Sequence, residues 1–150
     1  WSKRHLTTIS HSYCNSDFFQ DLYHPIHTLL SKEYRYLIDL LSSTTALLKE
    51  WLDITTPVLY SSQLPCSRTK GDLILELCKQ VGATRYLSGP NGRDYINESR
   101  FSEQGVGVEY HDYEQPTYHQ TLPVRSEGFL SNLSVIDLLF NQGPLSLGAA

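Results

Sequence analysis

The pattern of apolar and strand-forming residues between positions 56 and 113 constrains the fold more than any other feature. Runs rich in β-branched and aromatic residues alternate there with segments in which apolar residues recur at helical spacing. Short connections between such segments are typical of parallel strands joined by right-handed helical crossovers. The sequence therefore predicts an α/β fold with a short parallel β-sheet in the order β-α-β-α-β. The expected strands are 55–60, 84–88 and 106–113, and the expected helices are 70–81 and 97–104.

Helical spacing of apolar residues also marks both ends of the chain. A first helix is expected over 3–13, and a second helical face follows that we expect Pro25 to interrupt. Residues 34–52 form the longest periodic segment, and leucines on two of its faces predict a helix that is buried on more than one side. A last helix is expected over 133–141.

A length of 150 residues fits one domain with a sizeable core. We expect a single α/β domain over 1–150, with a helical part at 1–53, the β-α-β-α-β core at 54–113, and a loop with the closing helix at 114–150. The chain begins with Trp1 and contains no methionine. We therefore expect it to be a fragment of a longer chain.

Composition narrows the range of partners. A formal charge of −4 and a pI near 5.8 argue against sequence-independent nucleic-acid binding, which needs a basic surface. No run approaches the roughly 18 apolar residues of a membrane span. The cysteines Cys14, Cys66 and Cys78 are too scattered for a disulfide framework or a CxxC metal site, so free thiols in a cytoplasmic protein are expected.

The loop from Tyr86 to Tyr95 is the candidate ligand site. It follows an expected strand and contains Gly89 and Gly92, which permit positive φ or the close approach of another group. Asn97 is placed to cap the next helix, with Ile96 and Phe101 spaced as a hydrophobic staple around it. Open α/β sheets bind ligands at the carboxyl ends of their strands. The alternative is a tight βα turn that needs only its glycines.

Hydroxyls, backbone N–H groups and one guanidinium would gather at that edge of the sheet. Such groups suit a phosphate or carboxylate, and hence a sugar, nucleotide-sugar or phosphate-containing ligand. The loop matches neither a Walker A nor a dinucleotide fingerprint. An alternative for Arg93 is an ion pair with Asp94 or Glu98. The expected ligand-binding residues here are Ser61, Ser62, Ser88, Gly89, Asn91, Gly92 and Arg93.

A second cluster combines tyrosine and histidine side chains over 110–120. Tyr118 is expected to stack on a sugar or base, because tyrosine offers an apolar face and a hydroxyl; ordinary packing is the alternative. No spacing matches a zinc site, and no cofactor is indicated. In the closing helix, Asp137 and Asn141 share one face, where we expect them to support the glycine loop or a neighbouring helix.

Several motifs together resemble the bacterial WbqC-like family: Trp1-Ser-Lys-Arg-His5, Tyr86-Leu-Ser-Gly89, Gly92-Arg-Asp-Tyr95, Tyr118-His-Gln120 and the run from Leu133 to Gly143. The resemblance implies an association with gene clusters for surface-polysaccharide (O-antigen) and sugar modification. Members of the family begin with a His-Gln-Pro segment and further strands, which this chain lacks.

Two classes of function are open. One is a transferase-type enzyme acting on a sugar, a nucleotide-sugar or a small acyl or amino donor. The other is a non-catalytic binding or assembly domain that docks a partner protein through its sheet edge or tyrosine surface. This second class of function accords with the absence of a Gly-x-Ser-x-Gly or other nucleophile motif from the sequence. A homo-oligomer is a further possibility, because an incomplete sheet leaves unpaired edges.

Overall fold

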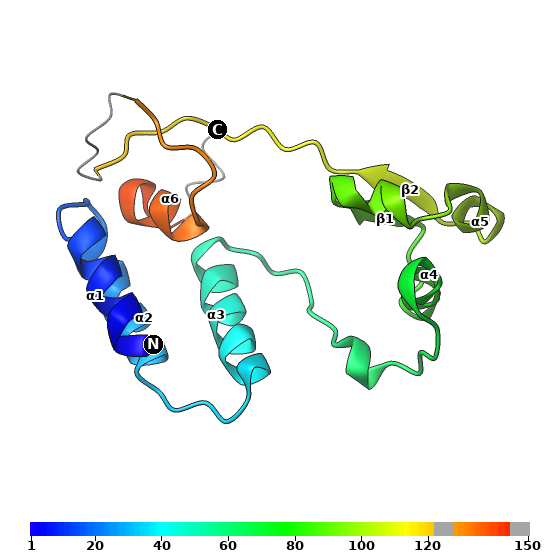
Figure 1. The fold of residues 1–150 in the computed structure, drawn as a ribbon, viewed down its shortest axis with the longest axis horizontal. Helices are drawn as coiled ribbons and strands as arrows, with labels where there is room; N and C mark the ends of the chain where they lie inside the picture. Colours follow the sequence, from blue (N-terminus) through cyan, green and yellow to red (C-terminus); the bar gives the residue numbers. More distant parts are fainter. Residues whose placement is uncertain (122–127, 145–150) are drawn as a thin grey trace. The chain divides into compact units, whose positions relative to one another are not determined.

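The computed structural model describes residues 1–121 and 128–144 (Figure 1). The chain divides into two compact units. We call Trp1–Thr56 with Gln115–Ala150 the helical unit, and Pro57–Glu114 the α/β unit. Their elements, in chain order, are α1 (Ser2–Tyr13), α2 (Phe19–Leu30), α3 (Leu37–Trp51), η1 (Ser61–Gln63), α4 (Lys70–Gln80), β1 (Arg85–Ser88), η2 (Pro90–Asp94), α5 (Glu98–Glu103), β2 (Gly107–Tyr110) and α6 (Val135–Gln142).

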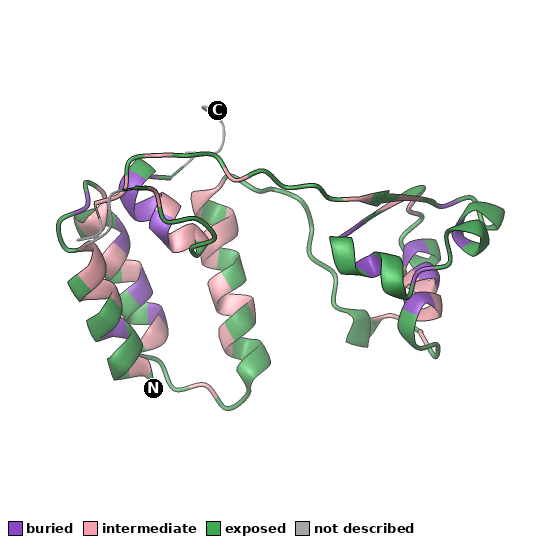
Figure 2. Ribbon diagram, turned by 45° about the horizontal axis from the view of Figure 1, so that its top comes forward, coloured by how far each residue is buried: buried purple, intermediate pink, exposed green. Residues whose placement is uncertain are grey.

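The helical unit is built on α2, which packs against α1, α3 and α6. Hydrogen bonds tie α1 to α2 at two levels: the Ser2 hydroxyl donates to the Leu30 carbonyl, and the Tyr23 hydroxyl donates to the Leu6 carbonyl. Figure 2 shows buried residues on α1, α2 and α6. The core of the unit is formed by Leu6, Leu22, Ile26, Leu139 and Phe140.

Pro25 lies inside α2, so the expected interruption of the helix is wrong. A proline in a helix interior removes one backbone donor and disfavours the preceding turn. Here Leu22, Ile26 and Leu29 are buried on both sides of it, at spacings of four and three residues. The burial of this face offsets the cost of the proline.

The helix α3 forms where the periodicity predicts it, but none of its residues is buried. Its C-terminal half carries Leu47, Leu48 and Trp51, which pack against the core of the helical unit. Its first turn instead exposes Leu37 and Ile38. The expected burial on more than one side is therefore wrong among the residues that the structure describes.

In the α/β unit, β1 and β2 form a two-stranded parallel sheet with Arg85 opposite Gly107 and Ser88 opposite Tyr110. The connection between them contains η2 and α5, as a crossover requires. Side chains alternate across the sheet: Tyr86 and Val108 pack on the core of the unit, whereas Leu87 is exposed. That core consists of Leu75, Cys78, Ile96, Phe101 and Val106.

The α/β class and the parallel pairing of the second and third expected strands are confirmed. The expected first strand, 55–60, does not form, and no β-pairing involves it in the described part of the chain. Pro57 has no N–H to donate to a ladder, and Val58 and Leu59 are exposed. The strand-forming residues of this segment therefore have no sheet to pair with.

Candidate functional site

The glycine loop turns directly after β1. Gly89 has φ −68° and ψ 164°, and Gly92 is not among the glycines with positive φ, so the left-handed backbone, one of the two roles considered for these glycines, is absent at both. Gly92 is needed for a different reason. A Cβ at this position would lie 1.9 Å from Ser88 Oγ and 3.0 Å from Ile96 Cδ1, whereas a Cβ on Gly89 would meet nothing within 4 Å.

The residues after the loop form the expected helix start. The Asn97 side chain accepts a hydrogen bond from the Arg100 N–H at 3.2 Å, which caps α5. Ile96 and Phe101 are both buried, as a hydrophobic staple requires. The loop is thus fixed at both ends, by β1 and by the start of α5.

Arg93 is the charged group that this loop presents. Its Cζ lies 3.9 Å from the centroid of the Tyr110 ring, a stacked cation–π geometry. Tyr110 is the last residue of β2, and parallel pairing places the ends of β1 and β2 at one edge. The His111 N–H donates to the Ser88 carbonyl at 2.8 Å and extends the pairing past this edge.

The ion pair of Arg93 with Asp94 or Glu98, which was the alternative to a ligand-binding role, is not formed. The two ion pairs among the described residues are Arg85–Glu109 and Arg100–Asp72. The Arg93 side chain is exposed, and its guanidinium is held by the Tyr110 ring, not by a carboxylate. A stacked guanidinium uses its face for the ring and keeps its N–H edge for other partners.

The Tyr110 hydroxyl is buried and has no hydrogen bond of standard geometry to any residue in the described part of the chain. Burial raises the pKa of Tyr110, and the Glu98 carboxylate raises it further, while the charge of Arg93 opposes the shift. The phenol therefore keeps its proton at neutral pH and remains a donor. Tyr110 lies in the aromatic cluster 110–120 indicated by the sequence, but its support of Arg93 was not predicted. The available signal was its place in the expected strand 106–113, next in the chain after the strand that precedes the loop.

The other expected ligand residues are placed differently. Ser88 is buried and donates to the Gly89 carbonyl at 3.0 Å, so its hydroxyl supports the loop. Asn91 is exposed within η2. Ser61 and Ser62 belong to η1, and because no strand forms before them, the reason to place them at the sheet edge is lost.

Asp137 is the centre of a polar network in the helical unit. It is fully buried on α6, and its Oδ2 accepts hydrogen bonds from the Tyr118 hydroxyl at 2.7 Å and from Gln120 Nε2 at 2.8 Å. Asn141, one turn later, accepts from the N–H and hydroxyl of Thr121 at 2.8 and 2.7 Å. These bonds fasten residues 118–121 to α6, so Asp137 and Asn141 support this segment, whereas the glycine loop or a neighbouring helix was expected.

Two tyrosines complete this network. The Tyr118 ring contacts Phe129 edge-on at 5.0 Å, and its hydroxyl is already bound to Asp137. The Tyr13 ring stacks on Phe140 at 4.8 Å. Burial raises the pKa of Tyr13, and the charge of Asp137 and a hydrogen bond to it raise this pKa further. The Tyr13 ring thus packs on the core, the Tyr118 ring packs on Phe129, and both hydroxyls bind the Asp137 carboxylate, as in the packing alternative.

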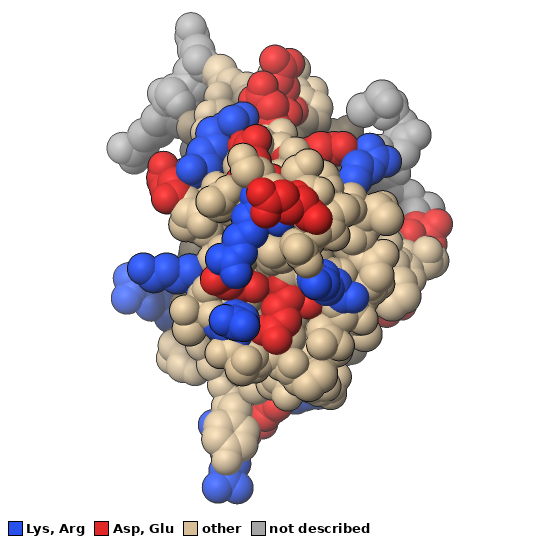
Figure 3. All heavy atoms as spheres, turned by 90° about the vertical axis from the view of Figure 1, so that its right-hand side faces the viewer, with Lys and Arg blue, Asp and Glu red and all other residues tan. Residues whose placement is uncertain are grey.

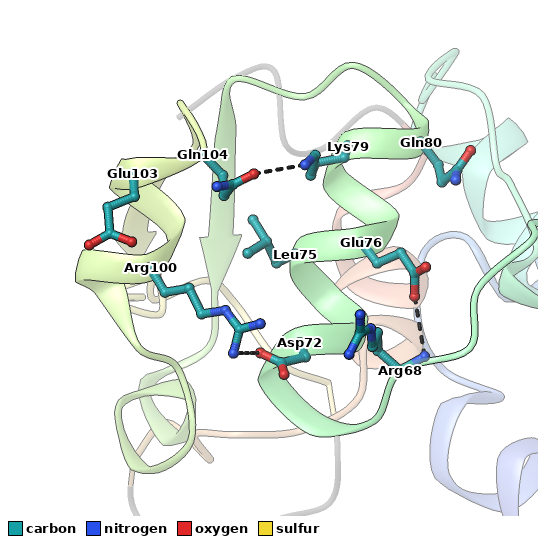
Figure 4. A pocket seen from close by; sticks show the side chains of 9 residues that line it. All are labelled: Arg68, Asp72, Leu75, Glu76, Lys79, Gln80, Arg100, Glu103 and Gln104. Atoms are coloured by element: carbon teal, nitrogen blue, oxygen red, sulfur yellow. Dashed lines mark hydrogen bonds and ion pairs between the residues drawn. The ribbon is translucent and has the colours of Figure 1, made fainter.

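A groove of about 440 Å³ runs between α4 and α5 (Figure 4). Its charged side chains are largely paired with each other. Arg100 contacts Asp72 at 2.7 Å, and Lys79 donates to Gln104 at 2.8 Å. Glu76 accepts from the backbone N–H groups that precede α4. These contacts link α4 to its neighbours and leave this groove with few free charges. Figure 3 likewise shows basic and acidic side chains interspersed on the face turned to the viewer.

The described residues contain no group of three His, Cys, Asp or Glu side chains that could hold a metal ion.

Burial raises the pKa of the Cys66 and Cys78 thiols, which lowers their thiolate fraction and their nucleophilicity. No helix in the described ranges is long and apolar enough to cross a membrane.

The profile of the WbqC-like protein family matches residues 1–148. The chain belongs to this family. A relative from Mycobacterium tuberculosis (strain ATCC 25618 / H37Rv), named "Uncharacterized protein Rv1507c", is 30% identical over 151 residues, which cover 95% of this chain. The chain spans 61% of that relative's length. No solved structure matches the chain.

Proposed function

We propose that the edge formed by Gly89–Arg93 and Tyr110 binds the anionic group of a small ligand, and that this WbqC-like protein serves a transferase-type reaction in bacterial surface-polysaccharide or sugar modification. The observation that carries the binding proposal is the guanidinium of Arg93. It is exposed, stacked on Tyr110 at 3.9 Å and unpaired among the described residues.

The stack makes Arg93 a suitable anchor for a phosphate. An arginine on a flexible loop loses side-chain entropy when it binds, whereas one already held on an aromatic ring loses less. The guanidinium N–H edge matches two oxygens of a phosphate or carboxylate. Because Gly89 has open space around its Cβ position, a ligand can approach the backbone there closely.

The chemical class rests on the family. The resemblance to proteins of sugar-modification clusters makes a nucleotide-sugar the proposed ligand, with its phosphates at Arg93. All three cysteines are free thiols in the structure, which is consistent with the reducing conditions of the cytoplasm, where we propose that the protein acts.

A second candidate is a binding or assembly domain without catalysis. The observation that favours it is the outer face of the sheet, where Leu87 is 59% exposed. Each strand has one neighbour in the described part of the chain, so each presents an edge to which a partner strand can add. Under this alternative, Leu87→Lys should impair binding of the partner protein, whereas Arg93→Ala should not.

Thermal melts with inorganic phosphate and with UDP-glucose test the anion site. Each ligand is expected to raise the melting temperature with concentration, because a ligand that binds only the folded state stabilises it. Arg93→Ala should lower the shift, and Arg93→Lys should restore part of it. Arg85→Ala is the matched control, since Arg85 is paired with Glu109 in the same unit. Equal shifts in wild type and Arg93→Ala would refute the site.

A further inference from the structure

We propose that a groove between α1 and α2, the α1–α2 groove, is a second binding site, which takes a phosphorylated sugar or polyol. It lies wholly within the helical unit and has a volume of about 600 Å³. Ligand sites of small molecules span about 300–1,000 Å³. The proposal is independent of Arg93, which belongs to the α/β unit.

One stripe of each helix lines the groove. On α1, Lys3, Thr7 and Ser10 recur at spacings of four and three residues, which places them on one face. On α2, Tyr23 and His27 are four residues apart and face the groove from the other side. The adjacent face of α2 carries the buried residues Leu22, Ile26 and Leu29. The groove is therefore a fixed feature of the α1–α2 packing.

The lining is basic and rich in hydroxyls. Lys3, His11 and His27 supply nitrogen donors, and Thr7 and Ser10 supply hydroxyls. None of the described residues that line the groove carries a carboxylate. The groove between α4 and α5 is different, because carboxylates there neutralise the basic side chains. The α1–α2 groove thus attracts an anion although the whole chain has a formal charge of −4.

The basic side chains of the α1–α2 groove are free to bind. Lys3, His11 and His27 form no ion pair and donate no side-chain hydrogen bond to another residue in the described part of the chain. Lys3 also stands in the first turn of α1, which contains no acidic residue. A cation in that turn opposes the helix dipole, and a bound anion would relieve this cost.

The combination of groups specifies the ligand class. A phosphate satisfies the ammonium of Lys3 and an imidazole N–H, and both contacts are charge-assisted. The hydroxyls of Thr7 and Ser10 match the hydroxyls of a sugar or polyol joined to that phosphate, as both donors and acceptors. A carboxylate alone would leave the hydroxyls of Thr7 and Ser10 without a partner on the ligand.

Amide NMR titrations of the whole chain test the proposal, with inorganic phosphate and glucose 1-phosphate as probes. Both probes should shift amide signals of α1 and α2. Lys3→Gln should weaken binding of both by about tenfold or more, as expected for a charge-assisted contact. Lys49→Gln is the matched control: Lys49 is on α3 of the same unit and does not line the groove.

A second variant tests the hydroxyls. Thr7→Val keeps the side-chain shape, so it should weaken glucose 1-phosphate several-fold and leave inorganic phosphate unchanged. Arg93→Ala should change neither titration of the groove, which separates this site from the one at the sheet edge. The proposal is overturned if neither probe shifts α1 and α2 amides, or if Lys3→Gln and Lys49→Gln bind alike.

Discussion

Gly89 and Gly92 lie in the same loop but have different surroundings. Gly89 has an ordinary extended backbone and open space where a side chain would project. Gly92 is buried against Ser88, whose hydroxyl donates to the Gly89 carbonyl. The loop therefore requires that Gly92 has no Cβ atom. It does not require a positive φ at either glycine.

Alanine substitutions should separate these two glycines. Gly92→Ala should lower the free energy of unfolding by more than about 1 kcal/mol, because its Cβ would overlap Ser88 Oγ. Gly89→Ala should be neutral or stabilising by up to about 1 kcal/mol, since it reduces the entropy of the unfolded chain. Urea denaturation of both variants measures the difference.

The double variant Ser88→Ala/Gly92→Ala provides the control. Removing Oγ eliminates the closest overlap, so it should recover part of the loss seen in Gly92→Ala. The explanation by lack of space fails if Gly92→Ala is as stable as Gly89→Ala.

At the scale of elements, prediction from the sequence was most accurate where the structure depends only on residues close together in the sequence. The α5 helix has a side-chain cap and a staple within six residues of sequence, and all of these interactions form. Pro25 and the segment 55–60 were misjudged because their outcome depends on packing partners. Proline in α2 is tolerated through the buried face beside it, and 55–60 lacks a strand to pair with.

The candidate site shows the same limit. The Gly89–Arg93 loop at the end of a strand was predictable from its position. Parallel pairing then brings Tyr110 under Arg93, and this contact depends on the register of two strands whose paired residues, such as Arg85 and Gly107, are far apart in the sequence. The α1–α2 groove was not predictable as a cavity. Helical spacing predicts which residues share one face of a helix, but not how that face packs on a neighbouring helix.

We expect the contact between α1 and α6 to weaken at alkaline pH. The raised pKa of Tyr13 means that the folded state holds this proton more tightly than the unfolded state, whose pKa is near the ordinary value of 10.0. The stabilisation is fully present below pH 10 and is lost as the pH rises above it. Urea denaturation between pH 8 and 11 should show this loss. Tyr13→Phe should flatten the dependence, and a slope as steep as that of wild type would contradict the assignment.

At the scale of the whole molecule, apolar surface is distributed unevenly. Leu37, Ile38 and Leu41 are each about half exposed or more on α3, and Trp1 is 66% exposed. A groove lined by Trp1, Tyr34, Tyr36, Leu37 and Leu40 adjoins the start of this helix. Exposed apolar patches of this kind promote association.

We therefore expect the isolated chain to self-associate through the start of α3. Light scattering over a range of protein concentrations should show a dimer or a larger species. Leu37→Lys/Leu41→Lys should shift the distribution toward the monomer, because two like charges would face each other across the interface. Val58→Lys, which changes an exposed residue of the α/β unit, is the control. A wild-type monomer at high concentration would exclude this association.

The helical unit is interrupted in sequence by the α/β unit, since it comprises Trp1–Thr56 and Gln115–Ala150. During synthesis, α1 to α3 leave the ribosome before the α/β unit, but the core of their unit also needs Leu139 and Phe140. At about 5–20 residues per second, these arrive about one to five seconds after the α/β unit is complete. The α/β unit can therefore fold first on the ribosome, while the first three helices wait with an open apolar face that a chaperone can cover.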